Sequence, residues 1–418
     1  MLNFVDYLFL YSLFAIWALL LFNVRLAFAG YSFQAEVMKR KVGWTRSRSE
    51  YPQVSILVPA HNEEKVIERS ILAMLKLSYP PDKIEIIVVN DNSSDKTGEI
   101  LQRLKAQHPQ RRIKMITTDA ETGGRGKANA LNIGLKQVEG EYIAVYDADN
   151  TPEPVSLRYL VAEIMSNKRY GAVIGKFRTR NKKANLLTRF INIETLSFQW
   201  MVQGGKWKLY RLCLLPGTNF IIRKSLLNEI GGWDNKAIAE DTELSIRIYL
   251  HGYQIAFMPH AVSWEQEPET LRVWLRQRTR WVKGNIYVLN KYLFTSLKNF
   301  KPILIDLGYR FVESFLFLSA VIVSDIIFIA GLLKICQISL PGNYIIIWLM
   351  AYILFLLEIN ISLALEKGEL NPENFFVVML MYFTYCQCWL VVCIIGICSY
   401  VRDALLGRRH VWYKTERF

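Results

Sequence analysis

Apolar residues are strongly segregated along this 418-residue chain. Residues 8–28 form a nearly unbroken apolar run, interrupted only by Asn23 and Arg25, and residues 303–401 contain three further apolar stretches. A helix needs about 20 apolar residues to cross a bilayer. The pattern therefore predicts a transmembrane helix within residues 1–30 and a carboxyl-terminal membrane region over residues 303–401.

The middle of the chain, residues 50–300, alternates short buried strands with amphipathic helices. Each strand-like apolar run ends in polar residues, and the segments between them repeat apolar residues at helical spacing. Repeated β-α-β units favour an α/β domain with a doubly wound, mostly parallel sheet, inserted here between transmembrane and interfacial helices. The predicted strands are residues 54–58, 84–89, 113–117 and 143–145, and the predicted helices are residues 66–77, 99–107 and 127–138.

Two segments, about residues 185–210 and 268–295, mix aromatic and aliphatic residues with basic ones. Trp200 and Trp207 belong to the first segment and Trp281 to the second. This composition is typical of helices that lie in the membrane interface, where indole rings are favoured. A helix in the core of the central domain is an equally good interpretation of each segment.

Basic residues decide the expected topology. Lys and Arg cluster at residues 39–48, directly after the first apolar run, and again in the tail, residues 402–418. The positive-inside rule then places the central domain and the tail in the cytoplasm. Since one leading and three trailing spans would leave the tail outside, we expect residues 375–401, which have a polar middle, to form a broken hairpin that enters and leaves on one face.

The whole chain is basic. It has 51 Lys and Arg against 37 Asp and Glu, a formal net charge of +14. A basic excess favours anionic partners, but the sequence contains no nucleic-acid-binding motif. We therefore expect nucleotide phosphates and lipid headgroups as partners, and no nucleic acid.

Two carboxylates follow the predicted strand at residues 143–145. Asp147 and Asp149, separated by one small residue, lie where that strand ends, and ligands bind at the carboxyl ends of strands in open α/β sheets. Together with phosphate oxygens, such a pair can hold a hard divalent cation such as Mg²⁺ or Mn²⁺. For this pair taken alone, an acidic turn is the alternative interpretation.

Two later motifs carry further candidate chemistry. Asp241, after Glu240, opens an amphipathic helix, where a carboxylate stays ionised as a base for an alcohol must; alone, it would be read as a helix cap. Gln277-Arg278-Thr279-Arg280-Trp281 places an amide, guanidinium groups and an indole within about one helical turn. Arginine suits a diphosphate, and an indole gives a flat face for a sugar ring.

Two glycine-containing loops complete the candidate set. Gly123–Lys127 lacks the spacing and the Ser or Thr of a Walker A loop, yet a glycine turn lets Lys127 and backbone amides approach an anion. Leu215–Asn219 is predicted to be a turn after an apolar strand, and it could line an acceptor site.

Taken in order, these motifs resemble those of the membrane-embedded processive glycosyltransferases of family 2, such as the cellulose, chitin, hyaluronan and poly-N-acetylglucosamine synthases. The family pattern is an isolated Asp, a DxD, a [TE]D and a QxxRW, matched here by Asp91, Asp147/Asp149, Glu240-Asp241 and Gln277–Trp281. The resemblance implies a cytoplasmic GT-A domain and a multi-pass protein of the plasma membrane. It also implies inverting, processive synthesis of a β-linked polysaccharide from UDP-glucose or UDP-N-acetylglucosamine, with Mg²⁺ or Mn²⁺ as cofactor.

The resemblance also implies roles for individual residues. The catalytic residues would be Asp241, Glu240 and Arg280, with Asp241 as general base. The nucleotide-binding residues would be Asn62, Glu63, Asp91, Lys127 and Asp147. The metal ligands would be Asp149 and Asp147, and the acceptor-binding residues would be Gly217, Thr218, Gln277 and Trp281. Trp412, Lys414 and Arg417 in the tail would belong to a shortened gating loop.

An alternative function stays open at this point: a non-processive membrane glycosyltransferase that adds a single sugar to a lipid acceptor. For the processive reading, the expected partners are the UDP-sugar donor, the growing polysaccharide and the lipid bilayer. Because only about four membrane passes are expected, a small membrane subunit or a second copy would complete the path of the polymer. No PilZ-like extension follows the membrane region, so direct control by cyclic di-GMP within this chain is not expected.

Overall fold

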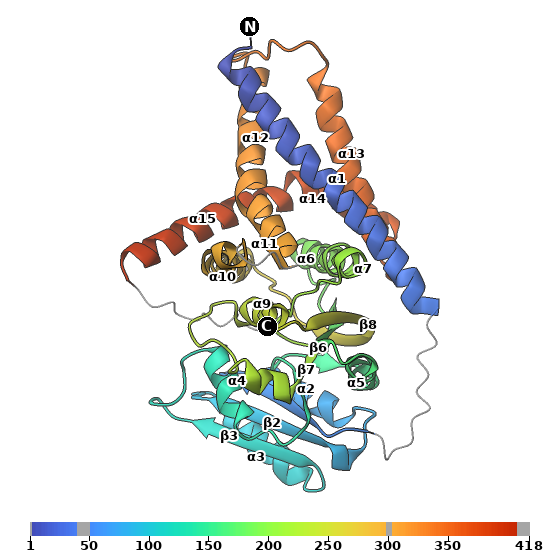
Figure 1. The fold of residues 1–418 in the computed structure, drawn as a ribbon, viewed down its shortest axis with the longest axis vertical. Coiled ribbons are helices and arrows are strands. Elements are labelled where there is room, and N and C mark those ends of the chain that lie inside the picture. Colours follow the sequence, from blue (N-terminus) through green and yellow to red (C-terminus); the bar gives the residue numbers. More distant parts are fainter. Residues whose placement is uncertain (1, 40–50, 298–302, 408–418) are drawn as a thin grey trace.

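The computed structural model describes residues 2–39, 51–297 and 303–407. Figure 1 shows three layers along the long axis: an α/β domain at the lower end, crossing helices in the middle, and long helices at the upper end. The long helices are α1 (Phe4–Lys39), α12 (Leu318–Leu332) and α13 (Tyr344–Ala364). The α/β domain and the most apolar helices therefore occupy opposite ends of the molecule.

Within the described residues, the domain contains an eight-stranded sheet of order β3-β2-β1-β4-β7-β6-β8-β5. Strands β3, β2, β1 and β4 pair in parallel, as do β6 and β8, whereas β7 runs antiparallel to β4 and β6, and β5 to β8. The predicted mostly parallel sheet and its four predicted strands are confirmed. The bounds are β1 Val54–Ala60, β2 Ile84–Asp91, β3 Arg112–Thr118, β4 Tyr142–Val145, β5 Thr151–Pro152, β6 Tyr170–Thr179, β7 Phe220–Arg223 and β8 Gln254–Glu265.

The central strands are apolar because helices cover both faces of the sheet. Every residue of β2 and β4 is buried, and continuous runs of Ile and Val are typical of such parallel strands. Each Ile or Val that is fully buried contributes about 1.5–3 kcal/mol. The helices of the domain are α2 Ile67–Leu75, α3 Thr97–Gln107, α4 Lys127–Leu135, α5 Ser156–Ser166, α8 Lys224–Glu229 and α9 Glu240–Leu250.

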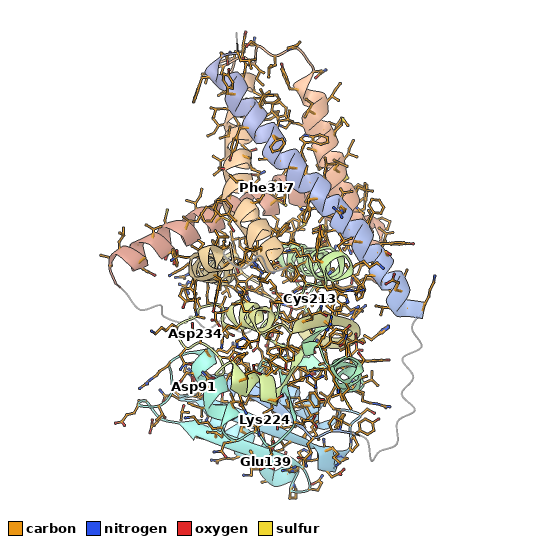
Figure 2. All side chains as sticks on the ribbon, in the orientation of Figure 1. Asp91, Glu139, Cys213, Lys224, Asp234 and Phe317 are labelled. Carbon is orange, nitrogen blue, oxygen red and sulfur yellow. The ribbon has the colours of Figure 1, made fainter. Side chains whose placement is uncertain are left out.

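The strand predicted before the Leu215–Asn219 turn is wrong, since β7 follows this turn and residues 212–216 form no ladder. The backbone amides of Cys213, Leu214 and Leu215 donate instead to the side chains of Tyr249, Gln203 and Ser245, at 2.8, 3.0 and 2.8 Å. Side-chain acceptors thus replace a neighbouring strand. Figure 2 shows Cys213 between the sheet and the crossing helices.

The segment predicted at residues 185–210 folds as α6 (Leu186–Ser197), a π-helical stretch Phe198–Gly205 and α7 (Lys206–Tyr210). Its Trp200 and Trp207 are each 3% exposed and pack into the main core, which favours the alternative interpretation of this segment as a core helix. The segment crosses α1 closely, because a Cβ on Gly30 would lie 2.1 Å from the Trp200 carbonyl oxygen.

Among the described residues, four helices are long and apolar enough to cross a membrane: Phe4–Lys39, Ile303–Leu332, Tyr344–Ala364 and Tyr385–Leu405. The second comprises α11 (Ile303–Phe311), a π-helical turn Val312–Phe317 and α12. The first helix continues past residue 30, where we expected it to end. Near its start, the Asp6 carboxylate accepts the backbone N–H of Ser339 at 2.8 Å, which ties α1 to the loop between α12 and α13.

Residues 375–401 are broken in the middle, as the sequence predicts. Thr384, with φ −124° and ψ −76°, separates α14 (Pro372–Phe383) from α15 (Tyr385–Leu405). Figure 1 shows α15 lying across the long axis, next to α10 (Leu271–Leu297). The break lies where the sequence predicts it, and a hairpin that enters and leaves a membrane on one face stays a prediction.

Candidate functional site

Asp91 ends β2 (Figure 2), and its carboxylate is held by the end of β3 and by the loop that follows β3. It is 4% exposed, and its Oδ1 accepts the Thr118 hydroxyl at 3.0 Å and the Gly124 N–H at 2.9 Å. A Cβ on Gly123 would lie 2.6 Å from the same oxygen, so only glycine lets the loop close over it. The glycine turn that we expected to face an anion therefore binds the carboxylate of Asp91.

The predicted nucleotide-binding residues Asn62 and Glu63, which follow β1, lie against the loop after β2 and the start of α3. Asn62 has a positive φ of 54°, and its Oδ1 accepts the Ser94 N–H at 2.7 Å. The Glu63 N–H donates to the Thr97 hydroxyl at 2.7 Å, and the Glu63 side chain is buried. Neighbouring parallel strands thus bring Asn62, Glu63 and Asp91 to one edge of the sheet.

Lys127, the first residue of α4, contacts three of the other candidate residues. Its Nζ lies 2.5 Å from Asp147 Oδ1 and 3.6 Å from Glu240 Oε1, and it donates to the Gly217 carbonyl at 2.8 Å. Burial opposes the charge of the ammonium group, but Asp147 and Glu240 outweigh this effect and raise the pKa of Lys127. One cation thus joins residues predicted for nucleotide binding, acceptor binding and catalysis.

The loop after β4 is fixed by Thr218. Its hydroxyl accepts the Asp147 N–H at 2.8 Å and donates to Asn150 Oδ1 at 2.6 Å. Asp149, in the same turn, is 3% exposed. Asn150 was not among the predicted site residues, and no pattern in the sequence marks it as a partner of a residue 68 positions away. Thr218 therefore shapes the turn that carries both carboxylates.

The backbone at Gly217 lies directly against the candidate base. Gly217 has a φ of +84°, and a Cβ there would lie 2.9 Å from Asp241 Oδ2 and 3.4 Å from Lys127 Nζ. Any larger residue would therefore be strained and would also displace the carboxylate. This contact brings the predicted acceptor loop to the predicted base.

Glu240 and Asp241 are the first residues of α9, as predicted. Burial raises the pKa of Glu240 to about 7, an effect that Lys127 opposes, and the negative charge of Asp241 adds to it. Burial also raises the pKa of Asp241, against the positive charges of Lys127 and Arg280. Because a raised pKa makes a carboxylate more basic, Asp241 is suited to accept a proton.

Helix α10 carries the QxxRW residues against the start of α9. A Cβ on Gly284 of α10 would lie 2.6 Å from the Cβ of Ala239, so the two backbones touch. This packing puts Arg280 close enough to lower the pKa values of Glu240 and Asp241. Gln277 is buried, whereas Trp281 is 41% exposed.

The residues that hold α9 on α10 were not predicted. Lys291 of α10 lies 2.8 Å from both Asp234 and Glu243, and Glu243 is fully buried. Arg247 also binds Glu243, with 2.7 Å between Nη2 and Oε2. Of these pairs only Glu243 and Arg247 have helical i,i+4 spacing; the contacts of Lys291 span 48 and 57 residues, beyond any local pattern.

The carboxylates of the site could hold a divalent cation only together with a bound ligand. Among the described residues no group of three or more His, Cys, Asp or Glu side chains could hold a metal ion. Asp147 and Asp149 supply two carboxylates, and Mg²⁺ or Mn²⁺ prefers six oxygens. A cation bound here would take the remaining oxygens from a diphosphate and water. The predicted gating-loop residues Trp412, Lys414 and Arg417 lie outside the described residues.

Comparison with known proteins gives consistent matches. The family model "Glycosyltransferase like family 2" matches residues 52–284. "Probable glycosyltransferase YdaM" of Bacillus subtilis (strain 168) is 48% identical over 413 residues, which is 98% of each chain. "Poly-beta-1,6-N-acetyl-D-glucosamine synthase" of Staphylococcus epidermidis is 33% identical over 270 residues, which is 64% of this chain and 63% of that protein.

A solved structure resembles the chain over nearly its full length. It is described as "Mannosyltransferase PcManGT from Pyrobaculum calidifontis in complex with GDP-Man and Mn2+". The TM-score is 0.61 and the sequence identity 21%, with 95% of this chain and 99% of that chain covered. This likeness concerns the fold, which includes both the α/β domain and the helices packed on it.

Proposed function

Since this chain belongs to glycosyltransferase family 2, we propose that it is a processive, inverting enzyme that builds a β-linked polysaccharide from a UDP-sugar. The observation that carries the proposal is the convergence of Lys127, Asp147, Gly217 and Asp241, with Arg280 nearby, between the sheet edge and α10. The staphylococcal relatives are named poly-β-1,6-N-acetyl-D-glucosamine synthases. We therefore propose UDP-N-acetylglucosamine, and not UDP-glucose, as the donor.

In the proposed reaction, Asp241 takes the proton from the terminal hydroxyl of the acceptor while that oxygen attacks the anomeric carbon. The bond between this carbon and the β-phosphate oxygen breaks as the new bond forms, and UDP leaves from the opposite face. An α-linked donor therefore gives a β-linked product. The raised pKa of Asp241 favours the proton transfer, and the guanidinium of Arg280 stabilises charge on the departing diphosphate.

A divalent cation is part of the proposal. The mannosyltransferase of similar fold binds GDP-mannose and Mn²⁺, and the DxD pair of this chain offers the oxygen ligands that Mg²⁺ or Mn²⁺ prefers. Asp149 and Asp147 would hold the ion on the donor diphosphate, where it would neutralise charge that develops on the leaving group. Lys127 already lies beside Asp147 and would also contact the phosphates.

The acceptor is proposed to lie on α10 and the Gly217-Thr218 turn. Gln277 and Trp281 lie within about one turn of Arg280 on α10, and the partly exposed indole of Trp281 offers a surface on which a sugar ring can stack. We place the α/β domain in the cytoplasm and the four apolar helices in the plasma membrane, where they would pass the product outward. A small membrane subunit or a second copy would complete that path.

Product size tests the proposal. Membranes containing the protein are incubated with radiolabelled UDP-N-acetylglucosamine, or separately with UDP-glucose, and the products are sized by gel filtration and lipid extraction. Long water-soluble polymer from one donor is expected. A single labelled sugar in the lipid fraction would overturn processivity and support the lipid-acceptor alternative, and no transfer from either donor would overturn the donor assignment.

A further inference from the structure

A cluster of charged and aromatic side chains lies behind the exposed indole of Trp281. The Glu194 cluster, as we name it, comprises Glu194 of α6, Arg278 and Trp281 of α10, and Tyr385 of α15. The ζ-carbon of Arg278 lies 3.8 Å from the ring centroid of Trp281, and its Nη2 lies 2.7 Å from Glu194 Oε2. Figure 1 shows α6, α10 and α15 within the middle layer of the molecule.

Arg278 contacts Glu194, Gln277 and the ring of Trp281. It is 1% exposed, and its Nη1 donates to Gln277 Oε1 at 3.3 Å. A buried guanidinium without a partner would be strongly destabilising, and Glu194 supplies the compensating charge. The second ring on Arg278 is Trp389, whose centroid lies 5.9 Å away. The cation thus lies close to one indole and within 6 Å of a second.

Glu194 is held from two other helices. The Tyr385 hydroxyl donates to Glu194 Oε2 at 2.7 Å, and Trp274 Nε1 donates to the Tyr385 oxygen at 2.9 Å. Trp274, Arg278 and Trp281 all lie on α10, so the network begins and ends on the helix that carries the acceptor residues. Its links to α6 and α15 fix the orientation of the Arg278 side chain.

Stacking on the guanidinium of Arg278 orders the indole of Trp281. One face of the indole is covered by the guanidinium, and the residue is still 41% exposed, so part of its surface is accessible to a ligand. A cation–π contact stabilises one orientation of the ring. The indole is thus ordered before any sugar binds, which lowers the entropy cost of stacking.

We propose that Glu194 and Arg278 are positioning residues that hold the Trp281 indole as the platform for the terminal sugar ring of the acceptor. The inference rests on the acceptor role of Trp281 in the proposed function. The ligand class is a pyranose presenting its apolar C–H face, such as the end of an N-acetylglucosamine oligosaccharide. Arg278 acts through Trp281 and touches neither donor nor leaving group.

Acceptor binding without turnover tests the inference. The dissociation constant of an N-acetylglucosamine oligosaccharide is measured on the purified full chain with UDP present, for wild type, Arg278→Lys, Trp281→Ala and the double variant. Lysine keeps the charge but loses the planar stack. We expect Arg278→Lys to bind about tenfold more weakly, consistent with one cation–π contact, and UDP binding to stay unchanged.

The double variant separates positioning from a general structural effect. If Arg278 works through Trp281, Arg278→Lys adds nothing once Trp281 is alanine, whereas independent effects would add. Additive losses, equal binding by wild type and Arg278→Lys, or no oligosaccharide binding by wild type would each overturn the inference. Glu194→Gln, which keeps the shape but removes the charge, should weaken binding in the same direction.

Asp403→Asn is the matched control. It breaks the 2.6 Å ion pair between Lys283 and Asp403, which also joins α10 to α15, without touching Trp281. Its oligosaccharide affinity should equal that of wild type, and an equal loss in this variant would overturn the specific role of Arg278. Because binding is measured without transfer, a chain that binds the oligosaccharide but makes no polymer contradicts the proposed function and not this inference.

Discussion

The two halves of the candidate site are built in different ways. The donor half uses loops at the carboxyl ends of β1, β2 and β4, where short hydrogen bonds fix Asn62, Asp91 and Asp147. The acceptor half uses α10, whose Arg278 depends on Glu194, 84 residues away. Topology fixes the donor residues almost alone, whereas the acceptor residues depend on how several helices pack on the domain.

The largest effect is expected where the two halves meet, at Asp241. Asp241→Asn cannot accept a proton, so turnover should fall by about 10³-fold, within the range for a lost general base. UDP affinity should stay within about twofold, because the side-chain shape is unchanged. Turnover is measured as UDP release and affinity by calorimetry; Asp82→Asn, an exposed carboxylate far from the site, is the control. Normal turnover in Asp241→Asn would remove the base assignment.

Lys127→Met tests whether one cation serves both halves. The variant loses charged hydrogen bonds to Asp147 and Gly217, so kcat/KM should fall by about 10–100-fold. Lys127 lowers the pKa values of Glu240 and Asp241, so its removal raises them.

The dependence of kcat on pH should also change in Lys127→Met. Since the base must be deprotonated, the acid limb of the kcat profile should move to higher pH in Lys127→Met, by roughly one unit for a neighbouring charge. A profile that stays in place, or moves to lower pH, would contradict the coupling between Lys127 and the two carboxylates.

The difference between local and distant contacts also explains which features could be predicted from the sequence. Buried parallel strands are continuous apolar runs, so β1, β2 and β4 and the polar residues after them were predicted correctly. The start of α9 at Glu240 also followed from local pattern. These features depend on residues close together in the chain.

The features that were left open or missed concern contacts between distant segments. The sequence leaves Trp200 equally between the membrane interface and the core, whereas the structure buries it where α1 approaches at Gly30; contacts between separate helices leave no local pattern. The strand before Pro216 is missing because the side chains of Gln203 and Tyr249 take its hydrogen bonds. Arg278 was read only as part of a motif, although its partner lies on α6.

Asp149→Ala should affect the donor half alone. Loss of one of two carboxylates leaves too few protein oxygens for a hard cation, so Mn²⁺-dependent UDP affinity should fall by about tenfold. UDP affinity in the presence of EDTA should be the same as for wild type, and so should binding of the oligosaccharide. A loss of equal size with and without Mn²⁺ would mean that Asp149 supports the fold of the turn and is not a metal ligand.

The smallest expected effect tests the packing that joins the two halves. In Gly284→Ala the new methyl would lie 2.6 Å from the Cβ of Ala239, so α10 must move away from the start of α9. Overpacking of this kind costs about 1–3 kcal/mol, and we expect a lower Tm together with a kcat reduced a few-fold. Gly308→Ala on α11 is the matched control, because a Cβ there has no neighbour within 4 Å and alanine is the better helix former. If both variants lose kcat equally, close contact between α9 and α10 does not set the position of Arg280. If only Gly284→Ala has a lower kcat, α10 must stay in close contact with the start of α9 for Asp241 and Arg280 to act together.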